Sequence, residues 1–177
     1  MLADWSADGK FLTINSGGVV MVVPLSGDQK VLERKAIDWL RDEYNVGQGR
    51  FSPDSRFMAY LSNEIKAETF EVYVRPFDPI KSDVSAGGDK PIRVSTAGAR
   101  GMISWRQDGK EMYYLTPDSE VMAVEVTTTP TFQAGVPRLL FRLPGPMLGN
   151  PPQWNNVSRD GQRFVFAINV PVSVSAR

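Results

Sequence analysis

The sequence predicts an all-β fold made of repeated antiparallel sheets, and two observations support this prediction. First, the 177 residues include 15 glycines and 13 prolines, which is many turns for this length and favours short strands over long helices. Second, one short motif recurs along the chain, each time as a tight polar turn followed by alternating apolar residues. The recurring unit is about fifty residues long.

The four copies of the motif align without gaps. They are WSADGKFLTI from Trp5, FSPDSRFMAY from Phe51, WRQDGKEMYY from Trp105 and VSRDGQRFVF from Val157. In each copy the second and fourth residues after the turn are apolar, as Leu12 and Ile14 are in the first copy. A period of two predicts a strand with one buried face, so each copy is predicted to be a β-hairpin.

The turn residues of the hairpins are expected to be structural. An aspartate at the corner accepts backbone N–H groups, and the next residue needs a positive φ, which glycine adopts easily. The predicted corner pairs are Asp8 with Gly9, Asp54 with Ser55, Asp108 with Gly109 and Asp160 with Gly161. Ser55 in the glycine place either costs roughly 1 kcal/mol or uses a slightly different turn. No copy has the alternating carboxylates of a calcium loop, so no metal site and no cofactor is predicted.

Further strands are predicted between the hairpins. Third strands are expected at 19–25, 70–77 and 120–126, and fourth strands at 31–32, 92–94 and 139–141. Four strands per unit of about fifty residues is typical of β-propeller blades. We therefore predict a single partial β-propeller domain of about three and a half blades. Blade 1 spans 1–44, blade 2 spans 45–98, blade 3 spans 99–143, and half of blade 4 spans 144–177.

Two connecting segments are less regular. Within 34–45, Ile37, Leu40 and Tyr44 have helical spacing, so this segment is predicted to be either a short helix or a long loop between blades. The proline-rich segment 142–156 is predicted to be a loop. A last strand is expected near 170–174.

Composition excludes several functions. The chain has no cysteine and no histidine, which removes Ser-His-Asp and Cys-His catalysis and the commonest metal ligands. Twenty basic and twenty acidic residues give a net charge of zero, so no nucleic-acid partner is expected. No apolar stretch is long enough for membrane insertion, and the first residues do not have the pattern of a signal peptide.

We therefore expect no enzyme activity, with one chemistry left open. A paired-carboxylate glycosidase needs two carboxyl groups about 5–9.5 Å apart across a cleft. The carboxylates available for such a pair are Asp38, Asp42, Glu43, Glu64, Glu68 and Glu71. A peptidase is excluded because no G-x-S-x-G nucleophile elbow is present, although the gating propeller of a peptidase remains an alternative.

The repeats resemble those of TolB-type, WD-repeat-like β-propellers across almost the whole chain. The stretches GQGRFSPDSRFMAYLSNE, EVYVRPFD, WRQDGKEMYYLTPDSEVMAVEV and DGQRFVF resemble most closely the C-terminal extracytoplasmic propellers of some bacterial serine/threonine-protein kinases. Such propellers usually have about six to eight blades and bind proteins or peptides. The resemblance implies a periplasmic or extracytoplasmic interaction module in a larger bacterial protein. The 177 residues themselves contain no kinase motif.

Three and a half blades leave two blade faces open, and three arrangements would cover them. The missing blades belong to a longer chain, or a second copy completes the ring, or the chain closes as a small four-bladed ring. An uncovered face exposes apolar side chains that are each worth about 1.5–3 kcal/mol when buried.

The function expected from the sequence is a non-enzymatic scaffold that binds a protein or peptide, with a carbohydrate-binding propeller as the alternative. Exposed aromatic residues and arginines in connections often anchor interfaces. The candidate binding residues of this kind are Trp39, Tyr44, Arg100 and Trp154. Their alternative role is to cover the rim of the core.

Overall fold

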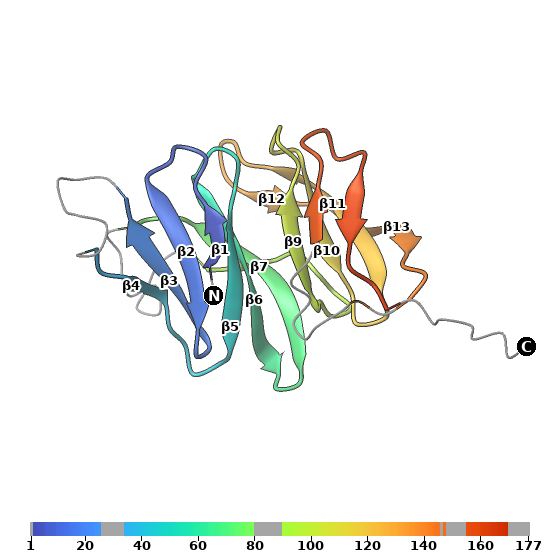
Figure 1. Ribbon diagram of the computed structural model, residues 1–177, viewed down its shortest axis with the longest axis horizontal. Helices are drawn as coiled ribbons and strands as arrows, with labels where there is room; N and C mark the ends of the chain where they lie inside the picture. The colour runs from blue at the N-terminus through green and yellow to red at the C-terminus, as the bar shows by residue number, and fades with distance from the viewer. Residues whose placement is uncertain (1, 26–33, 80–89, 146, 148–154, 170–177) are drawn as a thin grey trace, which may run out of the picture.

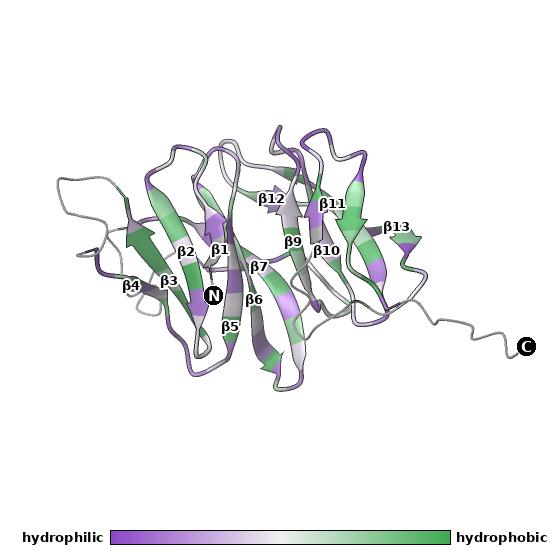
Figure 2. Ribbon diagram, viewed as in Figure 1, coloured by the Kyte–Doolittle hydropathy of each residue, from purple (hydrophilic) through white to green (hydrophobic). Residues whose placement is uncertain are grey.

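The computed structural model describes residues 2–25, 34–79, 90–145, 147 and 155–169. This part of the chain consists of strands and connecting turns, and its sheets follow one another along the long axis of the molecule (Figure 1). Apolar residues are concentrated on the strands and polar residues in the turns (Figure 2). None of the described residues forms a helix long and apolar enough to cross a membrane. The predicted all-β, propeller-type fold class is confirmed.

The strands form antiparallel sheets in sequence order. The first sheet contains β1 (Leu2–Trp5), β2 (Phe11–Ser16), β3 (Val19–Pro24) and β4 (Ile37–Leu40). The second contains β5 (Val46–Phe51), β6 (Phe57–Lys66), β7 (Thr69–Pro76) and β8 (Ile92–Arg93). The third contains β9 (Gly101–Trp105), β10 (Glu111–Leu115), β11 (Glu120–Thr127) and β13 (Arg138–Arg142), with β12 (Gln133–Ala134) paired to the end of β11. The fourth contains β14 (Asn155–Val157) and β15 (Phe164–Phe166).

The first strands of the four sheets lie side by side. β1 contacts β5, β5 contacts β9, and β9 contacts β14. The first strand of each sheet is therefore the innermost, and the last strand lies farthest from it across the sheet. This is the arrangement of blades in a propeller, and it follows from repeating one four-stranded unit along the chain.

Consecutive sheets pack face to face across three seams, which we call the first, second and third seam. The second and fourth residues after each turn face the preceding sheet: Met58 and Tyr60 lie in the core cluster of the first seam, Met112 and Tyr114 in that of the second, and Phe164 and Phe166 pack against that of the third. In the first three hairpins the first and third residues after the turn face the following sheet, as Phe57 and Ala59 do in the second seam. The period-two pattern therefore supplies both faces of each seam.

Aromatic side chains pack against one another within the first two seams. In the first seam, Phe77 packs edge-on against Phe11 and Phe51, with ring centroids 5.2 Å and 4.9 Å apart. In the second seam, Phe132 packs edge-on against Trp105, with centroids 6.1 Å apart, and contacts the ring of Phe57 in a tilted arrangement at 5.6 Å. Such pairs add about 0.5–1.5 kcal/mol beyond the burial of their area.

The predicted third strands are confirmed as β3, β7 and β11, and two of the fourth strands are confirmed as β8 and β13. The predicted strands at 31–32 and 170–174 lie outside the described residues. The blade boundaries stay a prediction.

The prediction for segment 34–45 is wrong in both of its forms. Residues Ile37–Leu40 form neither a helix nor a loop but β4, which pairs with β3 and completes the first sheet. Trp39 and Leu40 are both buried in the first seam, at 1% and 2% exposure. A four-residue strand is too short for its periodicity to be distinguished from that of a helix, and the pairing to β3 is a tertiary contact.

Candidate functional site

The turn aspartates accept hydrogen bonds from residues of their own hairpins. In the first turn the Ser6 hydroxyl and the Lys10 backbone N–H both donate to Asp8 Oδ1, at 2.7 Å and 3.1 Å. The second and fourth turns have the same serine–aspartate hydrogen bond, between Ser52 and Asp54 and between Ser158 and Asp160. In the third turn Arg106 Nε donates to Asp108 instead. These hydrogen bonds hold the pKa of Asp8, Asp108 and Asp160 below the usual range.

The residue after each aspartate has a positive φ. Gly9, Gly109 and Gly161 have φ of 73°, 71° and 72°, and Ser55 has a φ of 57°. Ser55 is thus in the left-handed region, which a side chain disfavours. The second hairpin keeps the same turn as the others despite its serine.

A cleft of about 610 Å³ opens on the inner side of the arc, beside the hairpin turns. We call it the inner cleft. The first strands of all four sheets, or the residues that directly follow them, contribute to its lining, which includes Asp4, Trp5, Arg50, Trp105, Asn156 and Arg159. The volume is in the range of sites that take a small molecule or a peptide side chain.

Asp4 joins the first and second sheets at the wall of the inner cleft. Its Oδ2 accepts the Phe51 backbone N–H at 2.8 Å, and its Oδ1 lies 3.7 Å from Arg50 Nη1. Burial raises the pKa of Asp4, and the charge of Arg50 and the Phe51 hydrogen bond oppose this rise. The carboxylate is therefore both a structural link and the acidic group of the cleft.

Two indole rings and two guanidinium groups shape the rest of the inner cleft. Trp5 is 62% exposed, and Trp105 Nε1 donates to the backbone oxygen of Arg50 at 3.4 Å across the second seam. The Gln107 backbone N–H donates to the Arg159 oxygen at 3.1 Å across the third seam. The described lining contains two guanidinium groups, those of Arg50 and Arg159, and one carboxylate, that of Asp4, which pairs with Arg50, so the cleft favours an anionic ligand with an apolar portion.

The structure does not bring the four predicted binding residues together. Arg100 lines a second cleft of about 640 Å³, which includes Gly18 and Pro117, and Tyr44 is 38% exposed but lines neither cleft. Trp39 is buried and packs edge-on against Tyr60, with centroids 6.2 Å apart, so it covers the core and is not available to a partner. Trp154 lies outside the described residues.

Sequence reasoning missed the residues of the inner cleft. Trp5 and Trp105 are the residues just before two of the turns, and Arg159 lies inside the fourth turn. The motif itself contains this signal, because an aromatic residue before the turn lies at the end of an innermost strand. That Trp5, Trp105 and Arg159 line one cleft, however, depends on how the sheets pack against one another.

The carboxylates considered for a glycosidase pair are not gathered in the inner cleft. Asp38 pairs with Arg41 at 2.8 Å, and Glu71 is buried, where it accepts hydrogen bonds from the Ser95 hydroxyl and the Gly98 N–H. Among the described residues, no group of three or more Asp or Glu side chains could hold a metal ion.

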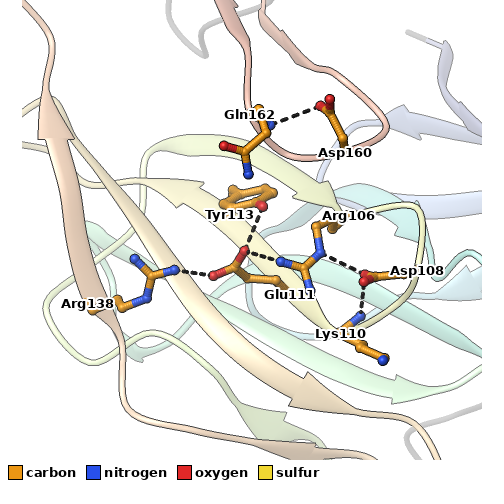
Figure 3. Close-up of polar contacts among 8 residues, drawn as sticks. All are labelled: Arg106, Asp108, Lys110, Glu111, Tyr113, Arg138, Asp160 and Gln162. Atoms are coloured by element: carbon orange, nitrogen blue, oxygen red, sulfur yellow. Dashed lines mark hydrogen bonds and ion pairs between the residues drawn. The ribbon is translucent and has the colours of Figure 1, made fainter.

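A polar cluster around Glu111 lies in the third seam, beside aromatic pairs such as Tyr113 with Phe164, whose ring centroids are 5.1 Å apart. Glu111, at the position of Phe11 and Phe57 in the first two hairpins, is 5% exposed. Its carboxylate accepts from Tyr113 Oη at 2.7 Å and from Arg106 Nη1 at 2.9 Å, and it also pairs with Arg138 (Figure 3). Burial, together with the Glu111 hydrogen bond, raises the pKa of Tyr113 to about 12.

The turn of the fourth hairpin, which carries Asp160 and Gln162, lies over this cluster (Figure 3), and its Gly161 approaches Tyr113. A Cβ on Gly161 would lie 2.1 Å from Tyr113 Oη and 3.0 Å from Arg106 Cδ. The close approach of the fourth sheet to the third therefore depends on a glycine at this position.

Solved structures of other proteins share this architecture. A candidate TolB protein from Agrobacterium tumefaciens matches with a TM-score of 0.58 and 20% identity, over 92% of this chain and 51% of that chain. The chain has a β-propeller fold. A candidate 6-phosphogluconolactonase from Bacteroides uniformis also matches this propeller, with a TM-score of 0.57 and 16% identity, over 94% of this chain and 47% of that chain. The chain spans about half the length of both structures.

At these identities the likeness shows the fold alone. No protein-family model and no curated protein sequence matches the propeller. The TolB-type part of the sequence resemblance agrees with the neighbours, whereas they do not bear on the closer resemblance to kinase propellers.

The prediction that the chain is not an enzyme is overturned by these neighbours. The propeller from Bacteroides uniformis, a candidate lactonase, has the same fold. The absence of histidine and cysteine removes only the chemistries that need those side chains, and it leaves reactions that use carboxylate, arginine or tyrosine groups.

The raised pKa of Asp4 predicts a pH dependence of stability. Because the folded state holds the proton more tightly than the unfolded state, the protein loses stability as the pH rises from about 3.8 through the folded pKa. Asp4→Asn removes this loss, so the free energy of unfolding of the variant should rise relative to that of the parent as the pH increases across this window. Urea unfolding at several pH values measures the difference.

Asp8→Asn is a control of opposite sign. Its lowered pKa stabilises the folded state above the usual value of 3.8, and this contribution is lost as the pH falls through the folded pKa. The Asp8 variant should therefore lose stability relative to the parent as the pH rises. Equal pH profiles for the two variants would contradict the opposite pKa shifts of Asp4 and Asp8.

Proposed function

We propose that the inner cleft binds an acidic segment of another protein. The observation that supports this proposal is the composition of the lining, which combines the guanidinium groups of Arg50 and Arg159 with the indole rings of Trp5 and Trp105 and includes a single described carboxylate, that of Asp4. Arginine and tryptophan are the residue types that contribute most to protein interfaces. An acidic side chain pairs with a guanidinium group while an apolar neighbour packs on an indole ring.

The position of the cleft favours an extended ligand. Its lining comes from the ends of all four innermost strands, so a bound segment would cross the seams and contact several sheets. Trp5 is 62% exposed and Arg159 is exposed, so both side chains are accessible without rearrangement of the core. Little reorganisation of the protein is then needed on binding.

The experiment is a titration with two labelled peptides that differ only in charge. One alternates aspartate with leucine, and the other alternates lysine with leucine. The acidic peptide is expected to bind more tightly, with an affinity that falls as salt is added. Arg159→Ala should weaken this binding by about 10-fold or more, because a charge-assisted hydrogen bond is lost.

Arg163→Ala is the matched control. Arg163 is an exposed arginine of the same hairpin that does not line the inner cleft, so its loss should leave the affinity unchanged. Equal binding of the acidic and basic peptides, or an Arg159 variant that binds like the parent, would contradict the proposal.

A second candidate function is catalysis on an anionic sugar derivative in the same cleft. Arg50 and Arg159 favour this candidate because they would hold an acidic or phosphorylated group. Asp4 also favours it, because its raised pKa is closer to the range of a general acid or base. The name of the Bacteroides uniformis neighbour suggests a phosphorylated sugar lactone as the first substrate to test. Hydrolysis above the uncatalysed rate, lost in Asp4→Asn, would support this candidate over the first.

We also infer that the propeller acts outside the cytoplasm as part of a larger bacterial protein. The sequence resemblance to extracytoplasmic kinase propellers and the likeness to a candidate TolB protein support this context. The binding segment would then belong to a partner in the same compartment, and fractionation of cells that produce the full-length protein tests the location.

A further inference from the structure

The second cleft, which Arg100 lines, lies at the opposite ends of the innermost strands from the inner cleft. The inner cleft is lined by the last residues of β5 and β9, whereas the second cleft is lined by the first residues of β5 and by the residues just before β9. The turns between β2 and β3, between β6 and β7 and between β10 and β11 complete its lining. The first three sheets therefore build this cleft together, and the two clefts have no described lining residue in common.

Much of the wall of the second cleft is apolar. Val46, Leu61 and Ala99 are buried residues of this wall, and Phe70 and Pro117 add a ring each. The volume of about 640 Å³ is in the range of small-molecule sites, which are typically apolar with a few polar groups that orient the ligand. The cleft therefore suits a small ligand with a large apolar part.

Two opposite charges line the second cleft without neutralising each other. The side chains of Arg100 and Glu68 form no ion pair with one another, and neither forms a hydrogen bond or an ion pair with any other described residue. Arg100 is half-buried and Glu68 is exposed. Because a partly buried charge is stabilised by a charged hydrogen-bond partner, both groups are available to a ligand group of opposite sign.

The backbone that carries these two charges is fixed by the fold. The Ala99 N–H donates to the Phe70 oxygen and the Arg100 N–H donates to the Leu115 oxygen, both at 2.7 Å, so this segment is bonded to the second and the third sheet. Glu68 lies in the two-residue turn between β6 and β7. Binding would therefore need little reorganisation of the main chain.

We propose that the second cleft binds a free amino acid with a large apolar side chain, whose carboxylate pairs with Arg100 and whose ammonium group pairs with Glu68. Such a ligand matches the lining, which offers one cation, one anion and an apolar wall. A simple carboxylic acid would leave Glu68 without a partner, and a simple amine would leave Arg100 without one. The site is separate from the inner cleft and does not rest on the function proposed for it.

The test compares three compounds of nearly the same shape by isothermal titration calorimetry. Phenylalanine carries both charges, 3-phenylpropanoate lacks the ammonium group, and 2-phenylethylamine lacks the carboxylate. The parent protein should bind phenylalanine about 10-fold or more tightly than either of the others, because each of them loses one charge-assisted contact. Equal binding of the three compounds, or no binding of phenylalanine at millimolar concentration, would overturn the proposal.

Two variants assign the charges. Arg100→Gln should weaken the binding of phenylalanine by about 10-fold or more but should not weaken that of 2-phenylethylamine. Glu68→Gln should also weaken the binding of phenylalanine but should not weaken that of 3-phenylpropanoate. Neither side chain has a partner among the described residues, so the fold should persist in both variants.

Arg159→Gln is the matched control. It removes the same charge from the inner cleft, so it should change none of these affinities. An Arg100 variant that binds phenylalanine as tightly as the parent, or an Arg159 variant that loses this binding, would overturn the placement of the ligand in the second cleft.

Discussion

Replacing Arg106 with alanine should lower the free energy of unfolding by about 3 kcal/mol. Arg106 donates to Glu111 at 2.9 Å, and Glu111 is only 5% exposed, so the substitution leaves a buried carboxylate with less compensation. It also removes the hydrogen bond to Asp108 at 2.8 Å, which helps to order the third turn. Urea unfolding followed by circular dichroism measures the loss.

Arg142→Ala provides the matched control. Arg142 also pairs with a glutamate, Glu120, but its own side chain is 72% exposed, so the loss should stay below about 1 kcal/mol. The double variant Arg106→Ala with Glu111→Gln should recover part of the stability, because the buried charge is removed together with its partner. Equal losses for Arg106→Ala and Arg142→Ala would show that the burial of Glu111 does not matter.

Gly161→Ala should cost about 2–4 kcal/mol, through two additive effects. Its φ of 72° is in the left-handed region, and its new Cβ would lie 2.1 Å from Tyr113 Oη. Tyr113 is 2% exposed and donates to Glu111, so it cannot move aside without breaking that hydrogen bond. The fourth sheet should therefore loosen from the third, which amide exchange in β15 reports directly.

Gly109→Ala separates the two effects. Gly109 has nearly the same φ, 71°, at the equivalent place in the third turn, but a Cβ there would meet nothing within 4 Å. Its cost should be roughly 1 kcal/mol, the strain of the backbone alone. If both glycine variants lose the same stability, the contact between the fourth turn and Tyr113 contributes nothing to the packing of the last sheet.

The hairpins could be predicted from the sequence because their signals are local. A turn such as that of Asp108 and Gly109 is set by hydrogen bonds within a few residues, and the period of two after it persists whatever lies in front of the sheet. β4 could not be predicted in this way. Its four residues become a strand through pairing with β3, so the sequence pattern alone places Trp39 in an exposed connection, whereas the structure buries it.

The candidate site was harder to predict, for a related reason. Trp5, Trp105 and Arg159 come from three different hairpins, and only the stacking of the sheets brings them to one cleft. Glu111 shows the same limit. The column holds Phe11 and Phe57 in the first two hairpins and Arg163 in the fourth, so a glutamate there suggests an exposed strand end, whereas the structure buries Glu111 between Arg106 and Arg138.

Each described sheet is built from strands that follow one another in the sequence, and neighbouring sheets share no strand. Duplication or deletion of a whole unit of about fifty residues would therefore leave the backbone ladders of all other units intact. Only the side chains at the two new junctions would have to adapt. Chains of this type can consequently change in blade number during evolution by gene duplication and recombination, with selection acting mainly on the residues that meet at each new boundary.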